Sequence, residues 1–288
     1  MEGRINKIIS NQYSVLDDKY NEYLCFCRGK VRLNNQKPKV GDFVVFNKFE
    51  DKYAIEKILD RKNELVRPPI ANIDQALICM SAVEPEFSCT LVDRLIFLIA
   101  YANIKPIIVI TKMDLCSEDN IIYKYIKDYQ DSGYTVLKIS KTKLDPDFFN
   151  VIKHQVNVLM GQSGVGKSSL INLIDPTLKL KTNIISTALN RGKHTTRHTE
   201  LFLFNEALLA DTPGFSALEL KDLDISILKD VILDFKPYHN MCKFNDCKHV
   251  NEPNCKIKEM VEKEKISKVR YQNYLDVLEI IKNGGKLI

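Results

Sequence analysis

One phosphate-binding motif constrains the fold of this chain more than any other feature of its sequence. The pattern G-x-x-x-x-G-K-S/T is satisfied by Gly161, Gln162, Ser163, Gly164, Val165, Gly166, Lys167 and Ser168, with Ser169 following directly. An apolar run at 156–160 predicts a buried strand before the motif, and a helical pattern continues through 170–174 after it. In this context the glycines let backbone N–H groups converge on a phosphate chain at a helix N-terminus. The motif therefore predicts an α/β fold that binds a nucleoside phosphate.

Two side chains of the motif have distinct expected roles, and the surrounding sequence predicts the sheet that holds them. Lys167 would reach the β and γ phosphates, and the Ser168 hydroxyl would ligate Mg²⁺. Apolar runs alternate with helical patterns along this part of the chain, at 75–80, 91–101, 107–110, 121–129, 136–139 and 207–210. Continuous apolar strands separated by helices indicate a parallel sheet covered on both faces.

Two further segments predict which base the nucleotide carries. Thr111, Lys112, Met113 and Asp114 follow the strand at 107–110 and resemble the guanine motif N-K-x-D, with threonine in place of the usual asparagine. An aspartate at the carboxyl end of such a strand accepts two hydrogen bonds from guanine N1 and N2, which adenine cannot supply. Ser140 and Lys141 follow the strand at 136–139 and resemble the S-A-K guanine loop. These residues predict binding of GTP and GDP.

The γ-phosphate end of the nucleotide is predicted to contact two more segments. Asp211 opens a D-x-x-G sequence, in which it would hold Mg²⁺ through water while the N–H of Gly214 meets the γ-phosphate. The loop 192–198 contains two threonines, and we expect Thr196 to complete the Mg²⁺ shell, with Thr195 as the alternative.

A histidine is the predicted catalytic residue of this site. Phe215 stands just after Gly214, where many GTPases carry a glutamine that orients water, and a phenyl ring forms no such hydrogen bond. We therefore expect slow intrinsic hydrolysis, with His194 orienting the attacking water and His198 as the alternative. Either histidine is also compatible with an ordinary exposed position in a loop.

The order of these motifs along the chain is unusual. In ordinary GTPases the phosphate loop comes first and the guanine motif follows D-x-x-G, whereas here Asp114 precedes Lys167 and Asp211 comes last. The same sheet can form if the old termini are joined and the chain is reopened between the D-x-x-G and guanine segments. The sequence thus predicts a circularly permuted GTPase domain at 68–220.

Residues 1–67 predict a small β-barrel. Aromatic and β-branched runs at 23–27, 43–46 and 53–58 are separated by turn residues, which suits an oligonucleotide-binding (OB) fold or an SH3-like barrel. Basic residues crowd one stretch of this region near Tyr23 and Phe26, namely Arg28, Lys30, Arg32, Lys37 and Lys39. This composition predicts a groove that follows RNA phosphates, although a solvated basic hairpin has the same composition.

Residues 221–288 are mostly helical in pattern and contain a candidate metal site. Cys242, Cys247, His249 and Cys255 supply three thiolates and one imidazole, which meets the tetrahedral requirement of a closed structural zinc site. The other five of the eight cysteines are scattered, mostly beside apolar segments, as buried free thiols are. We therefore expect one structural Zn²⁺ in a C-terminal zinc-binding domain.

Composition excludes several classes of protein. Apolar residues make up 45% and charged residues 27%, with a net charge of +5, as in an ordinary globular protein. The apolar runs are far shorter than the roughly 20 residues that a membrane helix needs, and the N-terminus lacks the apolar stretch of a secretory signal. We expect a cytoplasmic protein with no membrane partner.

A barrel, a permuted GTPase and a C-x₄-C-x-H-x₅-C cluster, in this order, resemble the RsgA (YjeQ/YloQ) family of small-ribosomal-subunit biogenesis GTPases. The resemblance implies GTP hydrolysis stimulated by the small ribosomal subunit, at a late step of that subunit's maturation. It implies the subunit and its rRNA as partners, and we expect a monomer. An alternative is an RNA-binding placeholder in which nucleotide occupancy, rather than hydrolysis, is the main function. An ATP-dependent small-molecule kinase is disfavoured by Asp114 and by the lack of a substrate domain in the sequence.

Overall fold

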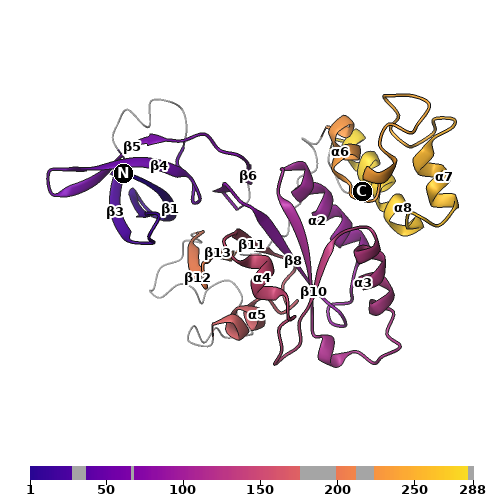
Figure 1. The fold of residues 1–288 in the computed structure, drawn as a ribbon, viewed down its shortest axis with the longest axis horizontal. Coiled ribbons are helices and arrows are strands. Elements are labelled where there is room, and N and C mark those ends of the chain that lie inside the picture. The colour runs from indigo at the N-terminus through magenta and orange to yellow at the C-terminus, as the bar shows by residue number, and fades with distance from the viewer. Residues whose placement is uncertain (28–36, 66–67, 176–198, 212–223, 285–288) are drawn as a thin grey trace.

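Three units follow one another along the chain in the computed structural model (Figure 1). The structure describes residues 1–27, 37–65, 68–175, 199–211 and 224–284. A β-barrel comes first, a helix-covered sheet stands in the centre, and a set of helices lies at the opposite end of the molecule from the barrel. This arrangement confirms the predicted fold class, while the predicted domain limits of 1–67, 68–220 and 221–288 stay predictions.

The N-terminal unit is a closed five-stranded barrel with the strand order β1-β2-β3-β5-β4. Its strands are β1 (Glu2–Ile9), β2 (Gln12–Leu16), β3 (Glu22–Cys27), β4 (Phe43–Phe49) and β5 (Lys52–Ile58). Alternate strand positions point inward, so Ile5, Val15, Val44, Phe46 and Ile55 are fully buried in one core. β3 and β5 pair in parallel, and the other neighbouring strands are antiparallel. Of the OB fold and the SH3-like barrel that the sequence allows, this pairing is that of the OB fold.

A short hairpin joins the barrel to the central sheet. It consists of β6 (Glu64–Leu65) and β7 (Ile70–Ala71), and the Asn72 side chain after it donates to the carbonyl of Gly41 at 3.0 Å. On the barrel side, the fully buried Asp42 carboxylate accepts from Arg61 Nε at 2.6 Å. Buried polar groups need such partners, so these bonds fix the barrel where it enters the sheet.

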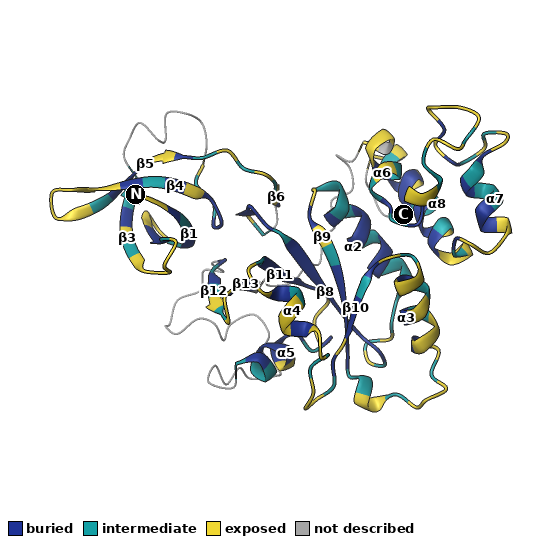
Figure 2. Ribbon diagram, viewed as in Figure 1, coloured by how far each residue is buried: buried dark blue, intermediate teal, exposed yellow. Residues whose placement is uncertain are grey.

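The central sheet has six strands in the order β10-β9-β8-β11-β13-β12. They are β8 (Gln75–Ser81), β9 (Lys105–Thr111), β10 (Thr135–Lys138), β11 (Val156–Met160), β12 (Leu201–Phe204) and β13 (Ala207–Asp211). The first five in this order run parallel, and β12 adds an antiparallel edge. All seven residues of β8 are buried, as Figure 2 shows for the centre of the sheet, because helices cover both faces.

Two pairs of helices cover these faces. Side chains of α2 (Cys89–Tyr101) and α3 (Ile122–Asp131) belong to one hydrophobic core, and those of α4 (Phe148–Ile152) and α5 (Lys167–Ile174) belong to the other. The short helix η1 (Met113–Leu115) follows β9. None of the helices in the described ranges has the length and apolar character needed to span a membrane.

The C-terminal helices pack on the first of these cores. They are α6 (Ile225–Val231), η3 (Lys236–Tyr238), α7 (Lys256–Glu262) and α8 (Lys268–Lys282). Tyr274, Val277 and Leu278 of α8 lie in the same buried cluster as Val92 and Ile96 of α2. The C-terminal unit is therefore held to the central sheet by apolar packing against α2.

Candidate nucleotide and metal sites

The predicted nucleotide motifs meet at one edge of the sheet. The guanine motif follows β9, the second guanine loop follows β10, the phosphate loop follows β11, and Asp211 ends β13. These four strands are parallel, so their carboxyl ends lie at the same edge, where α/β sheets bind ligands. The motifs therefore form one candidate nucleotide site, although their order along the chain is permuted.

The phosphate loop turns tightly between β11 and α5. Gly161 has a φ of 140°, and a Cβ placed there would come within 2.2 Å of the Cys79 carbonyl, so only glycine fits. Gly166 caps α5 with a φ of 95°, and the buried Lys167 begins the helix. The Lys167 ammonium donates to the carbonyls of Gly161 and Gln162, each at 2.7 Å. The loop therefore surrounds the Lys167 ammonium at the N-terminus of α5, a position that favours binding of a phosphate chain.

The two guanine loops are joined by hydrogen bonds around Asp114. Lys112 has a left-handed backbone conformation with a φ of 58°, which turns the chain from β9 into η1. The Asp114 carboxylate accepts from the backbone N–H of Lys141 at 2.8 Å, and the N–H of Met113 donates to Ile139 at 3.1 Å. Asp114 lies at the surface with Ser140 and Lys141 beside it, so the two segments form one loop cluster.

Thr111 occupies a position that the sequence did not indicate. Its side chain is 3% exposed, and its hydroxyl lies within hydrogen-bond distance of the carbonyls of Met80 and Val165. Thr111 thus ties the guanine loop to the floor of the phosphate loop. Its side chain is buried there, away from the surface where Asp114 lies.

A segment after β8 also belongs to this edge and was missed by sequence reasoning. The Lys112 ammonium donates to the carbonyl of Glu84, and Ser81 Oγ accepts from the N–H of Glu84 at 3.0 Å. Pro85 lies beside Gly164, since a Cβ on that glycine would be 3.8 Å from the proline ring. The one available signal was that this segment follows a parallel strand between the guanine and phosphate strands.

The remaining predicted residues are placed only in part. The backbone of Asp211 is paired in β13 opposite Leu159 of β11, which brings it to the same edge as the phosphate loop. Outside the described residues lie His194, Thr196 and Gly214, together with the alternatives Thr195 and His198 and the neighbouring Phe215.

The four predicted metal ligands converge on one point. Cys242, Cys247, His249 and Cys255 place their ligand atoms within 4.8 Å of one another. The three sulfurs lie 3.6, 3.3 and 3.4 Å from His249 Nδ1, and the sulfurs of Cys242 and Cys255 are 3.9 Å apart. Zn–S bonds of about 2.3 Å in a tetrahedron separate two sulfurs by about 3.8 Å, so the donor set fits such an ion.

Protonation also suits a cation at this point. Burial lowers the pKa of His249 to about 4, so the imidazole is neutral at pH 7 and its Nδ1 atom is able to coordinate a metal ion. Burial raises the pKa of the Cys247 thiol to about 12, so without a cation this side chain is a neutral thiol, and a bound metal ion would have to displace its proton. The hydroxyls of Tyr271 and Tyr274 on α8 donate to the carbonyls of His249 and Lys248 at 2.7 and 2.8 Å.

The predicted basic groove of the barrel is described only in part. Arg28, Lys30 and Arg32 lie outside the described residues, and Lys39 is paired with Glu64 at 2.9 Å. Tyr23 packs against Phe46 with ring centroids 5.2 Å apart, so it contributes to the aromatic interior of the barrel.

Comparisons with known proteins agree with this architecture. A model of the RsgA GTPase family matches residues 58–221, and a model of the RsgA N-terminal domain matches residues 2–55. The chain is 47% identical to "Small ribosomal subunit biogenesis GTPase RsgA 2" of Oceanobacillus iheyensis, covering 97% of each chain. It is 46% identical to "Small ribosomal subunit biogenesis GTPase RsgA" of Bacillus cereus, covering 98% of this chain and 97% of the relative. The chain belongs to the RsgA family of GTPases.

Solved structures of RsgA relatives extend the match to the whole fold. The crystal structure of YloQ, described as a circularly permuted GTPase, has a TM-score of 0.83 at 38% identity and covers 100% of this chain and 96% of that one. The structure of YjeQ from Thermotoga maritima has a TM-score of 0.85 at 34% identity and covers 98% of each chain. The permuted motif order and the class of enzyme, a GTP hydrolase, are confirmed for this RsgA-family chain.

Proposed function

We propose that this chain binds the small ribosomal subunit through its rRNA and hydrolyses GTP to GDP and phosphate there, at a late step of subunit maturation. The observation that carries the proposal is identity of 46–47% over nearly the whole length to proteins named for small ribosomal subunit biogenesis. Hydrolysis would time the release of the chain itself, or of other factors, from the subunit. We further propose that it acts in the cytoplasm as a monomer.

The guanine base is assigned to the loop cluster after β9 and β10. Asp114 would accept from guanine N1 and N2, while its bond with the N–H of Lys141 keeps the carboxylate in place. Lys112, Met113 and Ser140 would complete the contacts around the base. Thr111 would position the guanine loop relative to the phosphate loop, because its hydroxyl donates to the carbonyl of Val165 in the phosphate loop.

The phosphates are assigned to the loop after β11. Backbone N–H groups of 161–169 and of Gly214 would bind the phosphate oxygens, and the Lys167 ammonium would turn from its own loop carbonyls to the β and γ phosphates. Ser168, Thr196 and Asp211 would hold Mg²⁺, which when bound neutralises charge between the phosphates. His194 would orient the attacking water.

The C-terminal cluster is assigned to one structural Zn²⁺. Four protein ligands leave no open position, as in sites that stabilise a fold. Tyr271 and Tyr274 hold the backbone of the ligand loop against α8, so metal binding would stabilise the packing of that loop on the helix.

The test is the GTPase rate of the purified chain with and without small ribosomal subunits. We expect slow turnover alone and turnover faster by several powers of ten on the subunit, which is the scale that positioning groups supply in GTPases. Release is then compared between GTP and a non-hydrolysable analogue. Equal release with both nucleotides would contradict the timing role and favour the placeholder function.

A further inference from the structure

The barrel contacts the central sheet at a second place, far in sequence from the hairpin that joins the two. Lys7 of β1 forms an ion pair with Glu200 at 2.9 Å, and the backbones of the same two residues form an isolated antiparallel bridge. Their side chains are 34% and 21% exposed, so the pair is partly shielded from water. A backbone bridge and an ion pair at the same position define one specific contact.

The local structure of β1 aims Lys7 at this contact. Ile5 points into the barrel core, and in a regular strand the residue two positions later would point the same way. The pairing of β1 with β2 is irregular between Ile5 and Lys7, with Asn6 as the extra residue, and its side chain accepts from Ser14 Oγ at 2.6 Å. Such a bulge re-aims the following side chain, here toward the sheet.

The contact leads directly to the γ-phosphate side of the nucleotide site. Glu200 comes immediately before β12, whose first residue, Leu201, pairs with Ala210 of β13. The next residue of β13 is Asp211, which lies opposite Leu159 in the strand that carries the phosphate loop. In the sequence, Glu200 also follows Thr196 closely. The barrel therefore adjoins the strand pair that ends in the predicted Mg²⁺ residue.

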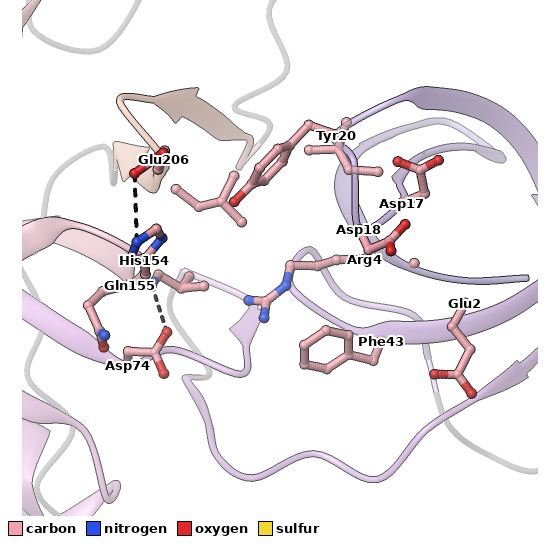
Figure 3. A pocket seen from close by; sticks show the side chains of 14 residues that line it. Glu2, Arg4, Asp17, Asp18, Tyr20, Phe43, Asp74, His154, Gln155 and Glu206 are labelled. Carbon is pink, nitrogen blue, oxygen red and sulfur yellow. Dashed lines mark hydrogen bonds and ion pairs between the residues drawn. The ribbon is translucent and has the colours of Figure 1, made fainter.

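This contact is separate from the anchor at the hairpin. There, the N–H of Ala71 donates to Val40 at 2.8 Å, and Arg4 donates to the carbonyl of Asn72 at 3.3 Å. A cleft of about 320 Å³ opens between barrel and sheet, and Figure 3 shows Tyr20 of the barrel facing His154 and Glu206 across it. The hairpin anchor remains when the Lys7–Glu200 pair is removed, so variants of this pair should fold.

We propose that Lys7 and Glu200 are positioning residues for subunit-stimulated GTP hydrolysis. They transmit the placement of the barrel on its RNA partner to β12 and β13, and so to the γ-phosphate side of the site. The inference rests on the proposed function, since it concerns the stimulated rate. Among the described residues, Lys7 and Glu200 contact each other and not the nucleotide motifs, so we expect the intrinsic rate to be unchanged when the pair is removed.

The experiment compares Lys7→Glu, Glu200→Lys and the double charge swap. The measured quantities are kcat and KM for GTP, with and without saturating small subunits. Each single variant should keep the intrinsic kcat and the KM and lose about fivefold of the stimulated kcat, the upper range for a partly exposed ion pair. The double swap should restore most of the stimulated kcat.

Two controls separate this mechanism from weaker RNA binding. Glu200→Lys adds positive charge, so a loss of stimulation in this variant does not arise from weaker attraction to phosphates. Lys57→Glu makes the same charge change as Lys7→Glu at an exposed position of β5 and should leave the stimulated kcat unchanged at saturation. Wild-type stimulation in both single variants, or a double swap no better than the singles, would overturn the inference alone. Absence of stimulation in the wild type would contradict the proposed function, and this inference with it.

Discussion

Arg270 connects the C-terminal helix to the GTPase unit through a buried charge network. On α8, its guanidinium pairs with Asp234, lies 3.5 Å from the carboxylate of Asp93 on α2, and donates to Ser132 Oγ at 2.9 Å. It also lies over the rings of Tyr129 and Tyr134, 4.5 and 4.8 Å from their centroids. Asp93 is fully buried and accepts further hydrogen bonds from Tyr129 and Asn273. One cation thus compensates two buried carboxylates at this junction.

Replacing Arg270 by methionine keeps much of the volume and removes the charge. Asp93 and Asp234 then remain buried without a cation, and loss of one partner of a buried pair costs about 3–5 kcal/mol of unfolding free energy. Burial raises the pKa of Asp93 to about 6, although the charge of Arg270 lowers it. Replacing Arg270 by methionine should therefore raise the pKa of Asp93 further. When a carboxyl has a raised pKa in the folded state, the unfolding free energy of the protein increases as pH falls through that pKa. The increase is at most about 1.4 kcal/mol per pH unit. The loss should therefore be largest at pH 8 and smaller at pH 6.

The assay is urea unfolding followed by circular dichroism, with the variant compared with wild type at each pH so that common titrations cancel. The control is Lys127→Met, which removes an exposed pair with Asp131 whose side chains are 72% and 63% exposed. That change should cost less than about 1 kcal/mol at both pH values. Either of two results would contradict the conclusion that Arg270 compensates the buried charges of Asp93 and Asp234. One is that Arg270→Met lowers the unfolding free energy as little as the control does, and the other is that it lowers this free energy by the same amount at pH 8 and pH 6.

Three further predictions concern the proposed sites. Asp114→Asn should weaken GTP binding at least tenfold and allow xanthine nucleotides to bind, because the amide no longer accepts hydrogen bonds from both guanine N1 and N2. A competition titration measures these affinities, and equal binding of ATP and GTP by the wild type would contradict the base assignment. Purified protein should contain about one zinc by elemental analysis, and Cys247→Ser should lose it and expose the C-terminal unit to protease while nucleotide binding persists. Charge reversal of Arg28, Lys30 and Arg32 together should weaken subunit binding and flatten its salt dependence without changing the intrinsic rate, and unchanged affinity would assign these residues to solvated surface.

The convergence of the candidate nucleotide motifs at one edge of the sheet could be predicted because each motif is a short segment of the sequence. Each motif follows an apolar run, and parallel strands bring their carboxyl ends together whatever their order along the chain. The metal cluster could be predicted for a similar reason, since Cys242 and Cys255 lie close enough in sequence for one loop to bring them together. In both cases the residues that act together are near one another in sequence, or at equivalent ends of neighbouring strands.

The long-range contacts could not be predicted from one sequence. Asp93 and Arg270 each stand in an amphipathic helical pattern, where a charge ordinarily faces water, and only the packing of α8 on α2 reveals that both are buried. Thr111 is predicted to belong to the base-binding loop, and the motif did not reveal that its short side chain also fits beneath the phosphate loop, where Gly166 leaves room for it. The ion pair of Lys7 with Glu200 depends on a bulge in β1, which hydrophobic alternation does not reveal.

The permutation determines how the two outer units join the sheet. The barrel enters through β7 and continues into β8, a central strand that lies beside the phosphate-loop strand β11. The chain leaves the sheet from β13, the strand of Asp211, and continues to α6, which packs on α2. In an unpermuted order, β13 would lead back into the sheet and its end would be tied to further strands. Here the β12–β13 pair has the barrel at its beginning, through Glu200, and the route to the C-terminal helices at its end. The barrel therefore adjoins the β12–β13 pair, which ends in the predicted Mg²⁺ residue. The C-terminal unit packs on α2, which also contacts β9, the strand that leads into the predicted guanine motif.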